Sequence, residues 1–345
     1  MPEMLYRGRR AFRIANDELQ LTVLEEGGHI ASIEQRASGV NPLWTPPWPS
    51  IEPSVFDPAA HTRYGNDAES KLLGGIMGHN LCLDIFGGPS AEEAAAGLTV
   101  HGEASVAAYE ISGDEASLQM SARLPEAALR VEREIRLKGD TAEIVETVEN
   151  LTAVDRPIGW TQHVTMGPPF IERGKTQFRV PATRSKVIEF DFTGGKGLQK
   201  TGAEFLWPHC PRMDEGTIDL QVYPADAVSA GYTAHLMDLS RQEAFFVAWH
   251  PGSRLLFGYV WQRADFPWLG RWEENHSRTN LPWNGETLTC GMEFGVSPMP
   301  ETRRQMVERG TLFGVPGYRW IPARSRVSVR YRAFARMAES IPEAP

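Results

Sequence analysis

Four titratable side chains lie in or beside apolar, strand-like segments of this sequence. They are His79 in GGIMGHNLCLDIFGG, His101 in LTVHGEAS, His163 in GWTQHVTMGPPF and Glu293 in TLTCGMEFGVSP. Imidazole and carboxylate groups are the usual carriers of general acid–base catalysis near neutral pH. Because these residues are too far apart in the chain to form a local motif, their spacing alone does not gather them into one pocket.

Each of these residues also has a structural interpretation. A histidine on a strand is commonly a hydrogen-bonded structural residue. Glu293 is different, because Met292 and Phe294 flank it and a carboxylate in an apolar strand is costly unless it is paired or used. Both interpretations of Glu293 stay open at this point.

A second candidate feature is the aromatic segment WQRADFPWLGRWEENHSRTNLPW. Flat aromatic faces beside polar groups suit pyranose rings, which have an apolar C–H face and a rim of hydroxyls. A tryptophan-rich core or dimer surface would give the same pattern. The aromatic residues are Trp261, Phe266, Trp268, Trp272 and Trp283, interleaved with Arg263, Arg271, Glu273 and Glu274.

Composition narrows the class of partner. The 345 residues are 41% hydrophobic and carry a formal net charge of -9, which disfavours a nucleic-acid partner. The N-terminus lacks the apolar segment of a secretion signal, and no run approaches the roughly 18 apolar residues of a membrane span. We expect a cytoplasmic protein without a membrane partner, and reduced structural cysteines at Cys82, Cys210 and Cys290.

The elements that must position these residues are mostly β-strands. In LRVEREIRL (129–137) apolar and charged residues alternate, which predicts a half-buried strand that continues through Gly139-Asp140 into a hairpin with AEIVETVEN (142–150). Similar strands are expected in LQLTVLEE (19–26), SVAAYEIS (105–112), ASLQMSAR (116–123), EAFFVAWH (243–250), RLLFGYVW (254–261), TLTCGMEFG (287–295) and RVSVRYRAF (326–334).

Helical signals are few. SAEEAAAG (90–97) has a capping-box spacing, and PETRRQMVERG (300–310) ends at a glycine. Many short strands without interleaved helices predict a sandwich or barrel that occupies residues 1–345 as a single domain. The long loop-like stretches 38–72 and 191–214 are expected to edge a site, because loops of this length are often functional.

Several segments, in order, resemble the aldose 1-epimerase (galactose mutarotase-like) family. They are GGHIASIEQRASGVNPLW, HGEAS, REIRLKGDTAEIVETVENLTAVDRPIGWTQHVTMGPPFI, DFPWLGRWEE and RWIPARSRVSVRYRAF. The resemblance covers nearly the whole chain, although each motif is short. It implies a mostly β fold, a β-supersandwich of antiparallel strands with few short helices, that binds a sugar in a groove on its concave sheet.

The resemblance also implies roles for individual residues. His163 matches the histidine that acts as general acid on the ring oxygen of the sugar, and His101 matches the histidine of the His-Gly motif that helps to hold the sugar. We expect the remaining contacts to a carbohydrate to come from Arg63, His79, Trp268, Trp272 and Glu273.

The sequence departs from the family pattern where galactose mutarotases carry their base. Arg324 and Ser325 of IPARSRVSV stand where a glutamate would be expected. Glu293 is the nearest match to the base of the related hexose-6-phosphate 1-epimerases, and Glu273 and Glu274 are reserve candidates. Galactose is not implied as the substrate, because Val164-Thr165 replaces the usual Tyr-Phe and the sugar-contacting aspartate has no match.

These observations lead to a hypothesis with open alternatives. The leading hypothesis is an isomerase of the aldose 1-epimerase type that uses His163 as acid and Glu293 as base and needs no cofactor. A non-catalytic carbohydrate-binding or sensing protein is the alternative, motivated by the missing glutamate. A metal-assisted lyase or isomerase using the histidines is weaker, because the candidate ligands are widely separated. A phosphorylated sugar would require arginines, for which Arg63, Arg263, Arg271 and Arg278 are available.

Overall fold

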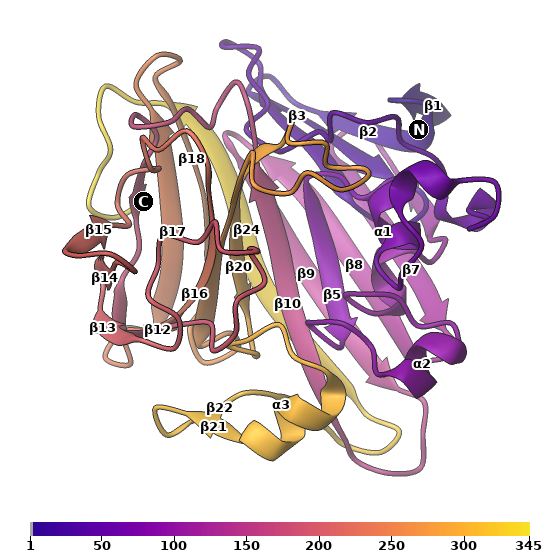
Figure 1. Cartoon of the computed structure of the whole chain (residues 1–345). Coiled ribbons are helices and arrows are strands. Elements are labelled where there is room, and N and C mark those ends of the chain that lie inside the picture. Colours follow the sequence, from indigo (N-terminus) through magenta and orange to yellow (C-terminus); the bar gives the residue numbers. More distant parts are fainter. Residues whose placement is uncertain (1–2) are drawn as a thin grey trace.

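The computed structural model describes residues 3–345, which form two antiparallel β-sheets packed face to face (Figure 1). The larger sheet has 12 strands, and β23 is attached to β10 beside the main path. In spatial order its strands are β1 (Glu3–Tyr6), β2 (Arg9–Ala15), β3 (Leu19–Leu24), β4 (Ile30–Gln35), β5 (His79–Asp84), β10 (Arg156–Met166), β20 (Leu288–Gly295), β19 (Trp268–Asn275), β16 (Ser229–Met237), β12 (Ala182–Val187) and β13 (Glu204–Leu206), with β23 (Arg319–Ile321) at the side.

The smaller sheet has eight strands and packs against one face of the larger sheet. In spatial order they are β11 (Gln177–Arg179), β17 (Glu243–His250), β18 (Leu255–Gln262), β24 (Arg326–Met337), β9 (Thr141–Asn150), β8 (Leu129–Lys138), β7 (Ser117–Leu124) and β6 (Glu110–Gly113).

Short elements cover the edges and the open face. Two small hairpins pair β14 (His209–Pro211) with β15 (Thr217–Asp219) and β21 (Thr311–Leu312) with β22 (Val315–Pro316). The helices are α1 (Ser70–Gly75), α2 (Ala91–Ala95) and α3 (Arg303–Arg309), with 3-10 turns η1 (Pro53–Val55), η2 (Thr62–Tyr64) and η3 (Glu103–Ser105). In Figure 1, α3 and the β21–β22 hairpin lie below the sheets, and α1 and α2 lie to the right of β5 in this view.

Alternation of side chains explains how the strands form. In β8 and β9 every second residue is buried, and the two strands pair from Leu129 and Asn150 to Lys138 and Thr141 around a turn in which Gly139 has a φ of 57°. The predicted hairpin is therefore confirmed. The central strands β10, β19 and β20 are buried on both faces, because the smaller sheet covers one face and loops cover the other.

Most predicted elements are present, with some shifts of boundary. The predicted mostly β fold is confirmed, and α2 has the expected capping box between Ser90 and Glu93. In the segment 105–112 the strand begins only at Glu110, because η3 and a turn occupy its first part. The C-terminal helix begins at Arg303, since Thr302 is its N-cap, and ends at Arg309 with the expected Gly310 as its C-cap.

Candidate functional site

His163 and Glu293 lie side by side on neighbouring strands. They are directly paired residues in the antiparallel ladder of β10 and β20, so both side chains point to the same face of the larger sheet. His163 Nε2 lies 3.1 Å from Glu293 Oε1, and the side chains are 6% and 3% exposed. The expected acid and base are therefore in contact with each other.

A glycine makes room for this contact. Gly291 precedes Glu293 on the same face of β20, and a β-carbon at this position would lie only 2.5 Å from Glu293 Oε1 and 3.2 Å from the β-carbon of Trp272. The carboxylate therefore folds back over the strand because the position carries no side chain. Glycine inside a strand frequently marks such a close approach.

Burial sets the protonation of the pair. Loss of hydration raises the pKa of Glu293 well above its ordinary value and lowers the pKa of His163 well below its ordinary value. The neighbouring His101 lowers the pKa of His163 further. Glu293 Oε1 accepts no well-aligned hydrogen bond from residues 3–345, so the 3.1 Å contact is a close approach without a formed hydrogen bond. Both directions favour a neutral acid beside a neutral imidazole.

The pair opens onto a cavity of about 210 Å³ on the face of the larger sheet that is turned away from the smaller one. The cavity has an apolar lining with few polar groups, as small-molecule sites commonly do. Its lining residues are Glu69, Leu73, Ile76, Phe86, Gly87, Gly88, Val100, His101, His163, Ile188, Phe190, Phe192, Tyr232, Trp272, Arg278, Trp283, Glu293 and Pro300.

His101 stands next to His163 in this cavity, with the two ring centres 4.8 Å apart. Its Nδ1 lies 2.7 Å from the carbonyl oxygen of Phe86, and donation to that carbonyl leaves Nε2 free to accept a hydrogen bond. Burial lowers the pKa of His101 to about 4. His101 is therefore a neutral hydrogen-bond acceptor at neutral pH, which is suited to a ligand hydroxyl.

Two tryptophans and one arginine form the part of the lining next to the pair, where the ring centres of Trp272 and His163 lie 6.0 Å apart. The rings of Trp272 and Trp283 meet edge to face with centres 6.1 Å apart, and the Arg278 guanidinium carbon lies 4.5 Å from the centre of the Trp283 ring. Arg278 also approaches Glu69 and Glu274, each at 3.6 Å. Its positive charge is thus balanced by two carboxylates of the protein.

Two polar residues beside the pair were not expected from the sequence. Asn80 on β5 is the ladder partner of His163, and Thr161 lies two residues before His163 on the same face of β10. Both are fully buried, and both amide atoms of Asn80 and Oγ1 of Thr161 lack a hydrogen-bond partner among the described residues. An asparagine inside the apolar segment HNLCLD is itself a signal, because a buried amide is costly unless it has a partner.

His79 lies on the other face of the sheet from His163. Its Nδ1 is 2.9 Å from the hydroxyl of Tyr259 and its Nε2 is 2.9 Å from Oε1 of Gln162, inside the interface between the two sheets. Burial lowers the pKa of His79 well below its ordinary value. In place of the expected sugar contact, His79 has a structural position in a buried network that continues through Gln162 to Glu146 and Arg133.

The other expected contacts also lie outside the cavity lining. Glu273 points to the sheet interface, where it pairs with Arg271 at 2.9 Å and accepts a hydrogen bond from Ser229. Trp268 is buried and donates its Nε1–H to the carbonyl of Pro316 at 2.9 Å. Arg63 is exposed on η2. Strand parity turns Glu273 to the interface, whereas Trp268 shares the face of Trp272 but lies at the other end of β19.

Two other positions considered for the base, Glu274 and the C-terminal turn, do not line the cavity. Glu274 accepts hydrogen bonds from the backbone N–H groups of Ser277 and Arg278, at 2.7 Å and 2.9 Å, and so holds the turn that carries Arg278. Arg324 and Ser325 lie in the turn between β23 and β24 and are not part of the cavity lining. Among the expected carboxylates, Glu293 is the one that lines the cavity.

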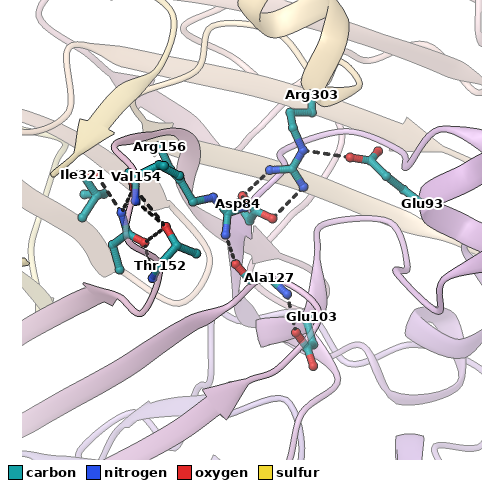
Figure 2. A network of polar contacts seen from close by, with 10 residues as sticks. Asp84, Glu93, Glu103, Ala127, Thr152, Val154, Arg156, Arg303 and Ile321 are labelled. Atoms are coloured by element: carbon teal, nitrogen blue, oxygen red, sulfur yellow. Dashed lines mark hydrogen bonds and ion pairs between the residues drawn. The ribbon is translucent and has the colours of Figure 1, made fainter. Parts of the chain in front are cut away.

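A buried charge network holds the rim of the cavity where Gly87, Gly88 and Pro300 lie (Figure 2). Asp84 ends β5 and accepts hydrogen bonds from Arg303 of α3 at 2.7 Å and from Arg156 of β10 at 3.1 Å. Arg303 also donates to Glu93 of α2 at 2.8 Å. The network joins the four elements β5, β10, α2 and α3, and the residues after β5 and before α3 line the cavity.

The chain has a larger hollow elsewhere. A surface depression of about 580 Å³ lies on strands β6 to β9 of the smaller sheet and is lined largely by polar side chains. We place the candidate site in the smaller cavity, because there buried histidine and glutamate side chains with shifted pKa values meet tryptophan rings. Residues 3–345 contain no group of three or more histidine, cysteine or acidic side chains arranged to hold a metal ion.

Comparison with known proteins shows the fold. No protein-family profile matches this sequence, and no curated protein matches it. A crystal structure of a proposed aldose 1-epimerase from Klebsiella pneumoniae matches with a TM-score of 0.69 at 14% identity, over 96% of this chain and 80% of that one. A galactose mutarotase-like protein from Clostridium acetobutylicum matches with a TM-score of 0.64 at 12% identity, over 98% of both chains.

A proposed aldose 1-epimerase from Escherichia coli K12 gives a TM-score of 0.63 at 11% identity, over 95% of this chain and 99% of that one. This chain therefore has the galactose mutarotase-like fold, and the resemblance inferred from its sequence is confirmed at the level of the fold. In the part of the chain that the structure covers, the helices are all too short or too polar to cross a membrane.

Proposed function

We propose that this protein interconverts the anomers of an aldose by general acid–base catalysis, with His163 and Glu293 as the proton-transferring pair. The observation that carries this proposal is the 3.1 Å contact between the two side chains at the wall of an aromatic-lined cavity. Reciprocal proton transfer requires one acid and one base that reach adjacent oxygens of the ligand. The ring oxygen and the C1 hydroxyl of a pyranose are such neighbours, since both are bonded to C1.

The direction of the proton transfers follows from the pKa shifts. A neutral His163 takes the proton of the C1 hydroxyl while a protonated Glu293 gives its proton to the ring oxygen. The bond between C1 and the ring oxygen breaks, and the products are an open-chain aldehyde, an imidazolium and a carboxylate. After rotation about the C1–C2 bond, both transfers reverse and the ring closes as the other anomer.

This assignment exchanges the roles expected from the sequence, because burial favours the neutral forms of both groups in the resting protein. Opening of the ring then creates opposite charges 3.1 Å apart, and their attraction offsets part of the cost of charging two buried groups. His101 is placed to accept a hydrogen bond from a further hydroxyl through Nε2.

The charges around the cavity favour an uncharged aldose over a sugar phosphate. Arg278 is the only arginine or lysine in the lining, and Glu69 and Glu274 already balance it. Arg271 is buried at the sheet interface with Glu273, and Arg263 is half-buried and donates to the carbonyl of Arg241. A phosphate group in the cavity would thus contact one arginine whose charge is already balanced, instead of a cluster of arginines.

A non-catalytic carbohydrate-binding or sensing function is the second candidate. The observation that favours it is the burial of both side chains, which are 6% and 3% exposed and already touch each other. If a ligand cannot reach both groups together, the cavity binds a sugar without reaction.

The rate of anomer exchange, measured by NMR magnetisation transfer on D-glucose, D-galactose, D-mannose and D-xylose, tests the proposal. We expect the wild type to accelerate exchange of at least one aldose, and His163→Gln or Glu293→Gln to reduce the acceleration about 100-fold or more. The matched controls are His250→Gln and Glu172→Gln. These residues form a second histidine–glutamate contact, at 2.9 Å, that lies outside the cavity.

Acceleration that survives both site substitutions would overturn the assignment of the pair. If the wild type accelerates no aldose but binds one saturably, and Trp272→Ala abolishes that binding, the non-catalytic function replaces the proposed one.

A further inference from the structure

Two separate apolar clusters contribute to the lining of the cavity at His163 and Glu293. The lining residues of the first cluster, which we call the α1 wall, are Leu73, Ile76, Val100 and Trp283. The lining residues of the second cluster, which we call the β16 wall, are Phe86, Ile188, Phe192 and Tyr232. Trp272 packs against both clusters.

The order of the strands places the β16 wall beyond Glu293 as seen from His163. Strand β20 lies between β10 and β19, and Gly270 of β19 is the ladder partner of Glu293. Strand β16 follows β19 in the sheet, and its Tyr232 lies over Gly270, where a β-carbon would overlap the tyrosine hydroxyl. Because position 270 carries no side chain, the β16 wall begins directly beside the carboxyl of Glu293.

The side chains of the β16 wall are hydrocarbon apart from one hydroxyl that is already engaged. Tyr232 is 2% exposed, and its hydroxyl donates to the carbonyl oxygen of Pro298 at 2.9 Å. The other polar side chains of the lining lie elsewhere, with His101 beside His163 and Arg278 against the ring of Trp283. A ligand hydroxyl placed against the β16 wall would therefore lose its water without gaining a side-chain partner.

The proposed reaction sets which part of the sugar meets this wall. His163 takes the proton of the C1 hydroxyl, and Glu293 gives its proton to the ring oxygen. The ring oxygen of an aldohexopyranose joins C1 to C5, and C5 carries C6. With C1 at His163 and the ring oxygen at Glu293, C5 and C6 extend past Glu293 toward the β16 wall. A methyl group at C6 would be buried favourably there, whereas a hydroxyl at C6 would not.

We infer that the preferred substrate of this site is a 6-deoxyaldose, whose C6 methyl group contacts the β16 wall beside Glu293. The inference rests on the proposed function, because the reactive pair sets the orientation of the sugar ring. It separates sugars that differ by a single oxygen atom. Rejection of an additional hydroxyl by a hydrocarbon pocket typically changes kcat/KM by about 10- to 100-fold.

Anomer exchange of matched sugar pairs tests the inference. The members of each pair differ only in the oxygen at C6, and the pairs are D-fucose and D-galactose, 6-deoxy-D-glucose and D-glucose, and L-rhamnose and L-mannose. NMR magnetisation transfer at several protein and sugar concentrations gives kcat/KM for each sugar, after correction for exchange without protein. We expect the wild type to favour the 6-deoxy member of at least one pair about tenfold or more in kcat/KM.

Two substitutions of Ile188, which is 6% exposed in the β16 wall, form a matched pair of variants. Threonine and valine have nearly the same shape, but only threonine offers a hydroxyl. Ile188→Thr supplies a partner for the C6 hydroxyl and should reduce the preference to about threefold or less, whereas Ile188→Val should retain it. Val100→Thr adds the same hydroxyl to the α1 wall and should also retain the preference. Because the preference is a ratio of two sugars on one protein, partial loss of folded protein does not change it.

The outcomes separate the substrate preference from the proposed function. Exchange without an advantage for the 6-deoxy member of any pair, or an advantage that Ile188→Thr does not reduce beyond Ile188→Val, would overturn the inference and leave the proposed function intact. If the wild type exchanges no aldose, the proposed function fails, and saturation-transfer NMR decides the preference. Tighter binding of D-fucose than of D-galactose that is lost in Ile188→Thr would support the inference, and equal or absent binding of the two sugars would overturn it.

Discussion

Glu293 Oε1 lies 3.1 Å from His163 Nε2, and the two residues are paired across β10 and β20. Burial raises the pKa of the carboxyl and lowers the pKa of the imidazole, so the pair is arranged to hold a proton on the carboxyl at rest. The same contact would stabilise the charged pair that ring opening creates. This relationship governs the expected dependence of activity and stability on pH.

The pH dependence of kcat/KM should differ from that of an enzyme with an ordinary histidine. In the proposed mechanism neutral His163 is the base, and its pKa is well below 6.5, so activity should persist as the pH falls through 6.5 and decline only at lower pH. On the alkaline side, activity should decline as the pH rises through the raised pKa of Glu293. Anomer exchange measured at each pH, corrected for exchange without protein, checks this. A decline centred near pH 6.5 on the acid side would contradict it.

Glu293→Gln should stabilise the protein at neutral pH. The folded state holds the proton of Glu293 more tightly than the unfolded state, so stability falls as the pH rises above 4.5 through the raised pKa. Glutamine removes this cost, and each unit of upward shift corresponds to about 1.4 kcal/mol. Urea unfolding should therefore show a gain of about 1 kcal/mol or more at pH 7 and none at pH 4.

Glu172→Gln is the matched control for this measurement. Hydrogen bonds from Lys175 and His250 lower the pKa of the exposed Glu172, which is the opposite direction. Its replacement should give no gain in stability at pH 7. A gain in both variants would show that the effect is not specific to the buried carboxyl.

Discrimination against phosphorylated sugars should depend on the partners of Arg278. Wild type should exchange D-glucose at least about tenfold better in kcat/KM than D-glucose 6-phosphate, because Arg278 is balanced by Glu69 and Glu274. Glu69→Gln should narrow this ratio by releasing positive charge toward the cavity. Parallel kinetics on the two sugars measure the ratio, and an unchanged ratio in Glu69→Gln would contradict the electrostatic explanation.

Asp84→Asn should destabilise the rim of the cavity. Removing the carboxylate leaves Arg303 and Arg156 without their shared partner, and breaking such a buried charge network typically costs about 3–5 kcal/mol (Figure 2). Denaturant unfolding measures the change in the free energy of unfolding. Glu308→Gln on the same helix, whose partner Arg304 is exposed, should change it by less than about 0.5 kcal/mol. Equal effects of the two substitutions would argue against a role for burial.

Local sequence patterns predicted most of the elements of the fold. The alternation in 129–137 predicted the hairpin of β8 and β9, and the capping residues predicted α2 and the end of α3. The strand Trp268–Asn275 was not predicted from the aromatic segment that contains it, because it is buried on both faces and its sequence shows no alternation. Both long loop-like stretches contribute to the cavity, through Glu69 and Phe192.

The candidate site was only partly predictable. The sequence by itself identified His101, His163, Trp272 and Glu293 as residues with suitable chemistry, because their types and apolar surroundings are visible in one dimension. Folding brings these four residues to one cavity, turns His79 and Glu273 to the opposite face, and places Asn80 beside His163. The physical reason is that strand register is set by packing across the whole sheet, and a shift of one residue would reverse the face of every side chain.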